Sequence, residues 1–175
     1  IEQLPDLVAQ FKIEAEKVGT KVHMANTPLE ALAIIGELAD RHGVRLVVKS
    51  KSMATEEIEL NEYLEEHHIK VVETDLGEWI IQLAGEKPSH LITPALHKTR
   101  EEIAKLFSKE TGEEIPPDIP LMVEVARKRL RQSFIDADMG ITGANVAIAE
   151  TGTIVLLENE GNIRMATMLG IVGAG

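Results

Sequence analysis

Residues 27–53 read TPLEALAIIGELADRHGVRLVVKSKSM and predict one helix followed by one buried strand. Thr27, Pro28 and Glu30 suit the N-cap, the first turn and the capping-box position of a helix. Apolar side chains then recur at helical spacing until Gly43, which can take the left-handed conformation that closes a helix. The strand candidate, residues 44–49, is apolar on both faces, as a covered parallel strand requires. A helix that leads into such a strand is the repeating unit of an α/β fold.

The same alternation continues on both sides of this unit. Further helices are expected at 3–18, 54–67, 99–109 and 119–136, further strands at 21–25, 69–73 and 90–93, and a surface loop at 110–118. Residues 76–84 fit a helix better than a strand. Helices interleaved with short apolar strands predict a single α/β domain over residues 1–175, with a mostly parallel sheet flanked by helices. Residues 1–26 are expected to form an N-terminal helical extension and a first strand.

Residues 140–162 read GITGANVAIAETGTIVLLENEGN and break the alternation. Two apolar runs flank the polar stretch 150–153, and this pattern predicts a buried pair of antiparallel strands. Such a pair would make the sheet mixed. Polar residues at the ends of the pair are well placed to meet a ligand.

The composition excludes several classes of protein. The chain has no cysteine, so it cannot form a disulfide or hold an iron–sulfur cluster by thiolates. A net charge of −11 and 3% aromatic residues argue against a nucleic-acid partner. We find no signal peptide and no apolar run near the length of a membrane span, so we expect a soluble, cytoplasmic protein without a transmembrane segment. Walker, Gly-x-Gly-x-x-Gly and Gly-x-Ser-x-Gly motifs are also absent.

Two polar clusters follow predicted strands. Lys49-Ser50-Lys51-Ser52 comes where a strand should end and a helix begin, and ligands in open α/β sheets gather beyond the carboxyl ends of strands. These side chains could hold a carboxylate or phosphate, or they could form a solvated turn in which Ser52 caps the next helix. Glu73-Thr74-Asp75 follows the next strand. Its carboxylates could act as acid and base, or Thr74 or Asp75 could cap a helix.

Histidines and neighbouring lysines form a third group of candidates. His90 and the pair His97-Lys98 could exchange a proton and stabilise negative charge, although a structural or surface role explains them equally well. Their spacing does not support a metal site. His67-His68 fits an exposed helix end, and the basic residues 127–131 fit a solvated helix face.

Several of these motifs together resemble the LUD family, and in particular the N-terminal domain of its lactate utilisation B members. The resemblance covers most residues from about 27 to 164 and rests on motifs in the same order: 49–53 with Glu56-Glu57, 73–78, 94–98, 140–145, 150–153 and 158–162. It implies a fold like that of the ribose-5-phosphate isomerase, glucosamine-phosphate deaminase and coenzyme A transferase group. Residues from about Leu169 do not continue the family pattern, which indicates a truncated or irregular end.

The resemblance also implies a role in oxidising L-lactate to pyruvate together with other lactate utilisation subunits. In that family the B component carries a C-terminal ferredoxin-like region whose cysteines bind [4Fe-4S] clusters, and that region is absent from these 175 residues. We therefore expect no cofactor or metal in this chain. The expected role is to bind a small carboxylate substrate or to dock subunits. The alternatives are a stand-alone isomerase or acyl-transferase, with Glu150 as base or nucleophile, and a noncatalytic scaffold.

The chemistry of these residues suggests how they could bind a 2-hydroxy acid. The carboxylate of such a ligand needs a cation, and its hydroxyl proton needs a base. Lys49, Lys51 and Lys98 are candidates for the cation, and His97 and Glu150 are candidates for proton transfer. The remaining substrate-binding candidates are polar or small residues of the same motifs: Ser50, Ser52, Asn145, Thr151, Gly152 and Thr153. We expect the motifs to converge at one edge of the sheet.

Overall fold

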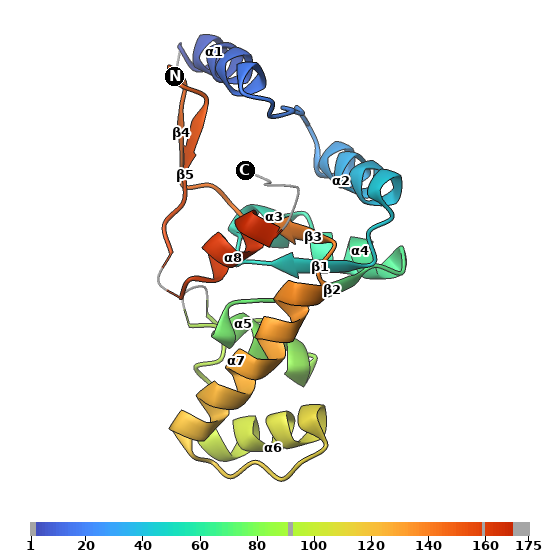
Figure 1. Cartoon of the computed structure of the whole chain (residues 1–175), viewed down its shortest axis with the longest axis vertical. Helices are drawn as coiled ribbons and strands as arrows, with labels where there is room; N and C mark the ends of the chain where they lie inside the picture. The colour runs from blue at the N-terminus through green and yellow to red at the C-terminus, as the bar shows by residue number, and fades with distance from the viewer. Residues whose placement is uncertain (1–2, 91–92, 159, 170–175) are drawn as a thin grey trace.

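A three-stranded parallel sheet forms the centre of the computed structural model, which describes residues 3–90, 93–158 and 160–169. The strands are β1 (Leu46–Lys49), β2 (Lys70–Glu73) and β3 (Met139–Ile141), in the order β2-β1-β3. β1 lies in the middle, as shown in Figure 1. The predicted α/β class with a parallel sheet flanked by helices is confirmed.

One face of the sheet packs against two helices, α2 (Pro28–His42) and α4 (Leu60–Glu66). Val47 pairs in register with Val71 and with Met139, and all three belong to the apolar cluster on this face. Leu60 and Leu64 of α4 are fully buried in the same cluster.

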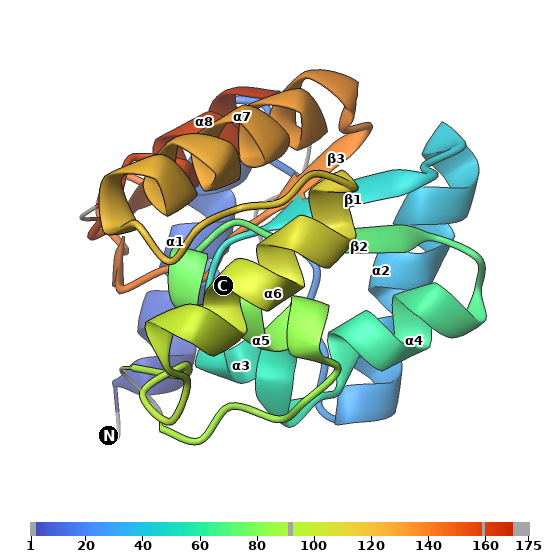
Figure 2. The same ribbon diagram turned by 90° about the horizontal axis from the view of Figure 1, so that it is seen from below.

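The opposite face packs against four helices, α5 (Leu76–Ala84), α6 (Arg100–Thr111), α7 (Ile119–Asp136) and α8 (Asn162–Leu169). Val48 and Val72 face this side, where the rings of Trp79 and Phe107 lie 5.0 Å apart between their centroids. Figure 2 shows the strands between α7 and α8 on one side and α2 and α4 on the other. None of the helices in the described part of the chain is long and apolar enough to cross a membrane.

The helix ends follow the sequence signals. Thr27 caps α2 by accepting a hydrogen bond from the Glu30 backbone N–H, and Gly43 closes the helix in the left-handed conformation. Thr99 and Glu102 form a complete capping box at the start of α6. These local signals are correct because each depends on residues within one turn of the helix end.

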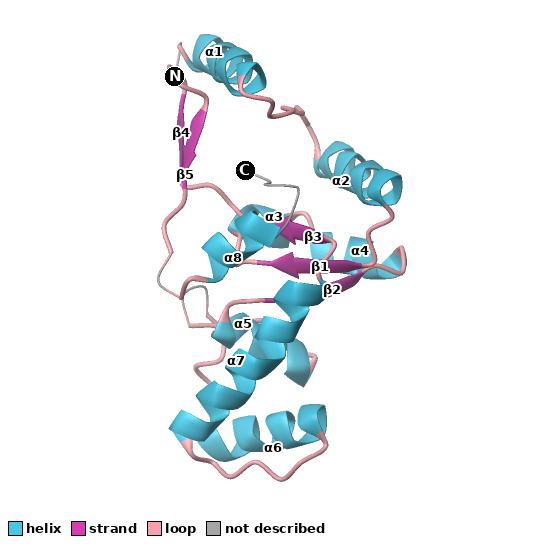
Figure 3. Cartoon of the chain, in the orientation of Figure 1, coloured by secondary structure: helices cyan, strands magenta, loops and turns pink. Residues whose placement is uncertain are grey.

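Two of the predicted elements are wrong in detail. The helix expected over 54–67 is divided into α3 (Met53–Glu57) and α4, with Glu59 in the left-handed conformation between them. The break lets α4 turn its buried leucines onto the sheet. Residues 21–25 form no strand and belong to neither sheet of the described chain, and Figure 3 shows them as loop. Part of the strand predicted at 90–93 lies outside the described residues.

The antiparallel pair is present but neither buried nor joined to the sheet. β4 (Val146–Ile148) and β5 (Thr153–Val155) form a separate two-stranded sheet whose side chains are largely exposed. This hairpin lies beside α1 (Leu4–Lys17), away from the parallel sheet (Figure 1). At the hairpin turn a β-carbon on Gly152 would lie 2.2 Å from the Ala15 backbone nitrogen, so only glycine allows this contact. The expectation of a buried pair in a mixed sheet is therefore corrected.

The close approach of α8 to β3 generates a stability prediction. A β-carbon on Gly140 would lie 2.0 Å from the Ala166 carbonyl oxygen, a backbone atom that cannot move independently of α8. We expect Gly140→Ala to lower the free energy of unfolding by about 1–3 kcal/mol and to accelerate amide hydrogen exchange in α8. Gly43→Ala is the control, because it adds left-handed strain without any atom within 4 Å. Unchanged exchange in α8 of the Gly140 variant would contradict the prediction.

Candidate functional site

Polar side chains gather where the three parallel strands end. The Ser50 hydroxyl donates to Thr142 Oγ1 at 2.7 Å, which connects the segments that follow β1 and β3. Thr74 donates from its hydroxyl to the Lys49 carbonyl at 3.0 Å, which connects the ends of β2 and β1. The carboxyl ends of parallel strands are the usual place for a ligand in an open α/β sheet, so we take this edge as the candidate site.

Lys49 and Glu73 form a buried ion pair at this edge. The two residues are direct partners across β1 and β2, and Lys49 Nζ lies 2.8 Å from Glu73 Oε1. Asn61 of α4 donates to the same carboxylate oxygen at 2.7 Å, and Lys49 donates to Thr55 Oγ1 at 3.3 Å. Since only 1% of Lys49 is exposed and its charge is neutralised, its main contribution is structural.

Lys51 and Glu78 form a second pair closer to the surface. Lys51 Nζ lies 2.8 Å from Glu78 Oε1, and 24% of the lysine side chain is exposed. Apart from this contact, neither atom has a hydrogen-bond partner in the described chain. Lys51 is therefore the lysine of this edge whose ammonium still has hydrogen bonds to offer.

Burial raises the pKa of the Glu78 carboxyl above its ordinary value of 4.5, although the contact with Lys51 acts in the opposite direction. The negative charges of Glu56 and Glu73 add to the increase. Glu160 lies at the same edge, where its carboxylate accepts a hydrogen bond from the Leu76 backbone N–H at 3.3 Å. Burial and the charge of Asp75 raise the pKa of Glu160 as well. Two carboxyls at this edge thus have pKa values above the ordinary one.

Some candidates from the sequence have structural roles here. Ser52 caps α3 by accepting from the Thr55 backbone N–H at 3.4 Å. Asp75 caps α5 by accepting from the backbone N–H groups of Gly77 and Glu78 at 3.0 and 3.2 Å. The capping interpretation of both residues is confirmed.

The histidine and lysine of the 94–98 motif are engaged elsewhere. Both His97 and Lys98 bind the Glu86 carboxylate, and the His97 Nε2 contact measures 2.8 Å. His97 Nδ1 also lies 2.8 Å from the Ser89 hydroxyl, and His90 Nδ1 accepts from the Thr93 backbone N–H at 3.3 Å. The ionic partner of His97 and Lys98 is therefore Glu86, whereas that of Lys51 is Glu78.

The 140–162 motif is divided between the edge and the hairpin. Thr142 and Gly143 lie at the edge, where a β-carbon on Gly143 would lie 3.0 Å from Ser52 Oγ. Glu150, Thr151, Gly152 and Thr153 instead form or adjoin the hairpin turn beside α1. Asn145 is used within the hairpin, because its Oδ1 accepts from the Leu157 backbone N–H at 2.8 Å. The expected convergence of the motifs at one edge is therefore wrong.

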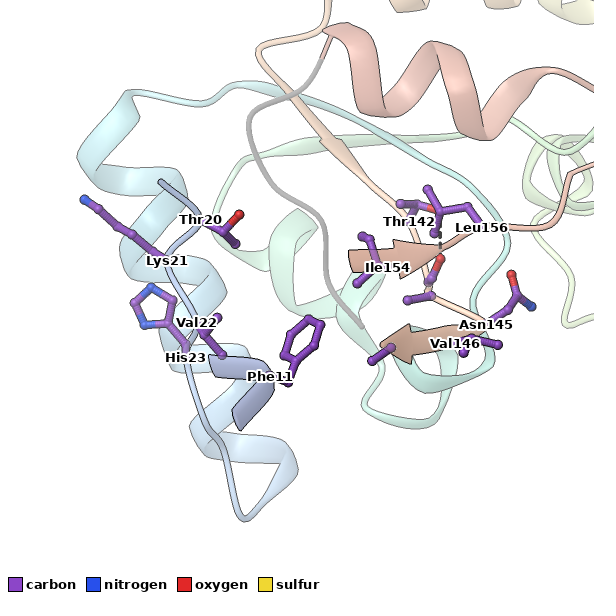
Figure 4. Close-up of a pocket in the computed structure, with 13 residues that line it drawn as sticks. Phe11, Thr20, Lys21, Val22, His23, Thr142, Asn145, Val146, Ile154 and Leu156 are labelled. Atoms are coloured by element: carbon purple, nitrogen blue, oxygen red, sulfur yellow. Dashed lines mark hydrogen bonds between the residues drawn. The ribbon is translucent and has the colours of Figure 1, made fainter. Parts of the chain in front are cut away.

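A cleft of about 320 Å³ separates the hairpin from the N-terminal segment. Its walls are mainly apolar, formed by Phe11 and Val22 on one side and Val146, Ile154 and Leu156 on the other. Figure 4 shows Phe11 directed toward the hairpin and the Lys21 ammonium directed away from it. Thr142 and Asn145 add polar groups where the cleft meets the end of β3. Such a cleft suits an apolar group better than an anion.

Residue chemistry alone missed Glu78 as a site residue. Glu78 directly precedes the buried residues Trp79, Ile80 and Ile81. A carboxylate next to such an apolar run is the feature of the sequence that could have indicated a buried charge. The sequence around Asn61 does not indicate its role at the site, because its partner Glu73 belongs to a different element.

The residues present do not fit an iron–sulfur cluster. The chain has no cysteine to supply thiolates. Within residues 3–90, 93–158 and 160–169, no group of three or more histidine, aspartate or glutamate side chains is placed to hold a metal ion.

The buried pair generates a second stability prediction. Lys49→Met leaves the Glu73 carboxylate buried without its cation, and we expect a loss of about 3–5 kcal/mol in the free energy of unfolding. Urea denaturation followed by the fluorescence of Trp79, the single tryptophan, measures it. Adding Glu73→Gln should recover part of the loss, since the amide oxygen can still accept from Asn61. Equal stability of the single and double variants would count against a coupled pair.

The pKa of Glu78 can be tested directly by carbon NMR of its carboxyl group. We expect a midpoint above 4.5, and a further increase in Lys51→Met because Lys51 lowers this pKa. Glu86, whose pKa Lys98 and His97 lower, is the internal reference. Because the folded pKa is raised, the contribution of Glu78 to stability is present below pH 4.5 and is lost as the pH rises through the folded value. A midpoint at or below 4.5 would contradict the prediction.

Comparison with known proteins places the chain in a family. The LUD domain family model matches residues 8–171. Lactate utilization protein B of Oceanobacillus iheyensis is 46% identical over 169 residues, which cover 97% of this chain and 35% of that protein. An uncharacterized electron transport protein of Escherichia coli, YkgF, is also 46% identical over 169 residues, covering 95% of this chain and 36% of that protein.

Lactate utilization protein B of Bacillus cereus is 44% identical over 162 residues, which cover 93% of this chain and 34% of that protein. The chain thus spans about a third of the length of the curated relatives it matches. No solved structure matches, so the relation to the isomerase, deaminase and transferase group stays a prediction. Because the family model matches most of its length and these relatives are 44–46% identical, this chain belongs to the LUD domain family.

Proposed function

We propose that this LUD domain binds the carboxylate of a small 2-hydroxy or 2-oxo acid within an iron–sulfur-dependent complex that oxidises L-lactate to pyruvate. The names of the relatives from Oceanobacillus and Bacillus support the connection with lactate utilisation. The name of the Escherichia coli relative supports electron transport as its context. The other lactate utilisation subunits are the proposed partners, and the proposed clusters belong to those subunits or to sequence outside these 175 residues.

The observation that carries this proposal is the state of Lys51. Its ammonium lies at the carboxyl edge of the parallel sheet, contacts one carboxylate and has no second partner within the described residues. A ligand carboxylate can supply the acceptors that this ammonium lacks, and charge-assisted hydrogen bonds are strong where water is partly excluded. Lys49 is less suitable because Glu73 and Thr55 already engage it.

Subunit docking is the second candidate role. The hairpin exposes apolar side chains, Val146 at 52%, Ile148 at 37% and Ile154 at 44%, and exposed apolar strands are typical of contact surfaces. A stand-alone isomerase or acyl-transferase has less support. Its proposed nucleophile, Glu150, lies in the exposed hairpin turn, whereas Lys51 lies after β1.

Titration calorimetry with L-lactate, pyruvate and a sugar phosphate tests the proposal. We expect both acids to bind. We expect Lys51→Met to lower their affinity about 10- to 100-fold, because a hydrogen bond to a charged group is lost. Lys128→Met is the matched control, since Lys128 pairs with Glu124 on an exposed face of α7. Turnover of the sugar phosphate would favour the isomerase alternative, and absence of binding by every anion would favour the docking role.

A further inference from the structure

The Lys51–Glu78 pair differs from the other buried pair at the sheet edge. One carboxylate oxygen of Glu73 accepts a hydrogen bond from Asn61 and makes an ionic contact with Lys49. Glu78 is also only 6% exposed, yet its Oε1 has one contact, with Lys51, and no second partner in the described chain. A buried carboxylate oxygen with a single partner costs stability, so its presence requires a physical explanation.

The charges around Glu78 come from three elements. Lys51 follows β1, Glu73 ends β2, and Glu56 belongs to α3. Lys49 neutralises Glu73, whereas Lys51 is the cation that contacts Glu78. A ligand carboxylate that reached Lys51 would place one more negative charge in this partly buried group. The least costly response is the loss of one of the negative charges already there.

We propose that a small carboxylate ligand replaces Glu78 as the ionic partner of Lys51, and that Glu78 takes up one proton from solvent as the ligand binds. This inference rests on the proposed function, since it specifies how the same lysine receives its ligand. The Lys51–Glu78 contact breaks, the contact between Lys51 and the ligand forms, and the Glu78 carboxylate becomes a carboxylic acid. No electron is transferred, so the exchange needs no oxidant or reductant.

The surroundings of Glu78 suit the protonated form. Burial and the charges of Glu56 and Glu73 raise its pKa, so its proton affinity is increased before any ligand arrives. Once protonated, Glu78 becomes a hydrogen-bond donor. Glu73 Oε2 and Asn61 Oδ1 are buried acceptors without a hydrogen bond in the described chain, and Glu73 is near enough to influence the titration of Glu78.

The ligand class follows from this exchange. The ligand needs one carboxylate for Lys51 and must be small, because the Lys51 ammonium itself is buried. L-lactate and pyruvate share that carboxylate and differ only at the neighbouring carbon. Both should therefore bind with the same proton uptake.

The test is calorimetry of L-lactate and pyruvate with the whole chain, in buffers of different ionisation enthalpy, from about pH 5 to about pH 8. The dependence of the binding enthalpy on the ionisation enthalpy of the buffer gives the number of protons taken up per ligand bound. We expect close to one proton per ligand above the pKa of Glu78, and about a tenfold loss of affinity per pH unit. Glu78→Gln should bind both acids without proton uptake and with a flat pH profile. Glu65→Gln, on the exposed face of α4, should behave like the unaltered protein.

The outcomes separate this inference from the proposed function. Binding without proton uptake in the unaltered protein would overturn the exchange and leave the carboxylate site intact. Failure of both acids to bind the unaltered protein and Glu78→Gln would overturn the carboxylate site itself. Proton uptake that persists in a folded Glu78→Gln variant would assign the proton to another group, with Glu160 the first to examine, and would also overturn the exchange. Circular dichroism checks that each variant is folded.

Discussion

The buried ion pair between Lys49 and Glu73 is the constraint on which the arrangement of the sheet edge depends. Removing two charges from water costs several kcal/mol per ion unless their geometry and hydrogen bonds compensate. The compensation comes from Asn61 and Thr55, which belong to the two short helices after β1. The left-handed break at Glu59 lets α3 and α4 take different directions, so Thr55 and Asn61 can both reach the pair. The same pair joins the ends of β1 and β2.

Two lysines separated by a single residue have different physical roles because of their depth. Lys49 shares the pleat of Val47 and ends inside the layer formed with α4, where Glu73 and Thr55 are its partners. Lys51 lies beyond the last strand residue, part of its side chain reaches solvent, and its carboxylate partner is biased toward protonation. The ion pair with additional hydrogen bonds holds the fold together, whereas the pair without them can exchange a partner. This contrast makes Lys51 the centre of the candidate site.

The hairpin and α1 form a region whose contacts depend on glycine. Gly152 has a φ of +64° and brings the hairpin turn against the backbone of α1, where any side chain would collide. Gly140 has the corresponding role inside the domain, where α8 crosses β3. Between the hairpin and the N-terminal segment lies the apolar cleft, next to the end of β3. The polar edge and the apolar cleft are therefore neighbours connected by residues 142–143.

The sequence by itself determined the α/β class, the parallel strands β1 and β2, and helix ends such as Thr27 and Gly43, because these depend on local periodicity and on hydrogen bonds within one turn. It also located Lys51 after a strand, at the edge of the sheet where the candidate site lies. Only the tertiary structure decided that Glu78 faces Lys51, that His97 and Lys98 bind Glu86 instead, and that the 150–153 motif lies beside α1. Those outcomes depend on which residues of distant elements meet, and on how far each charge is removed from water. Neither quantity is encoded in spacing along the chain.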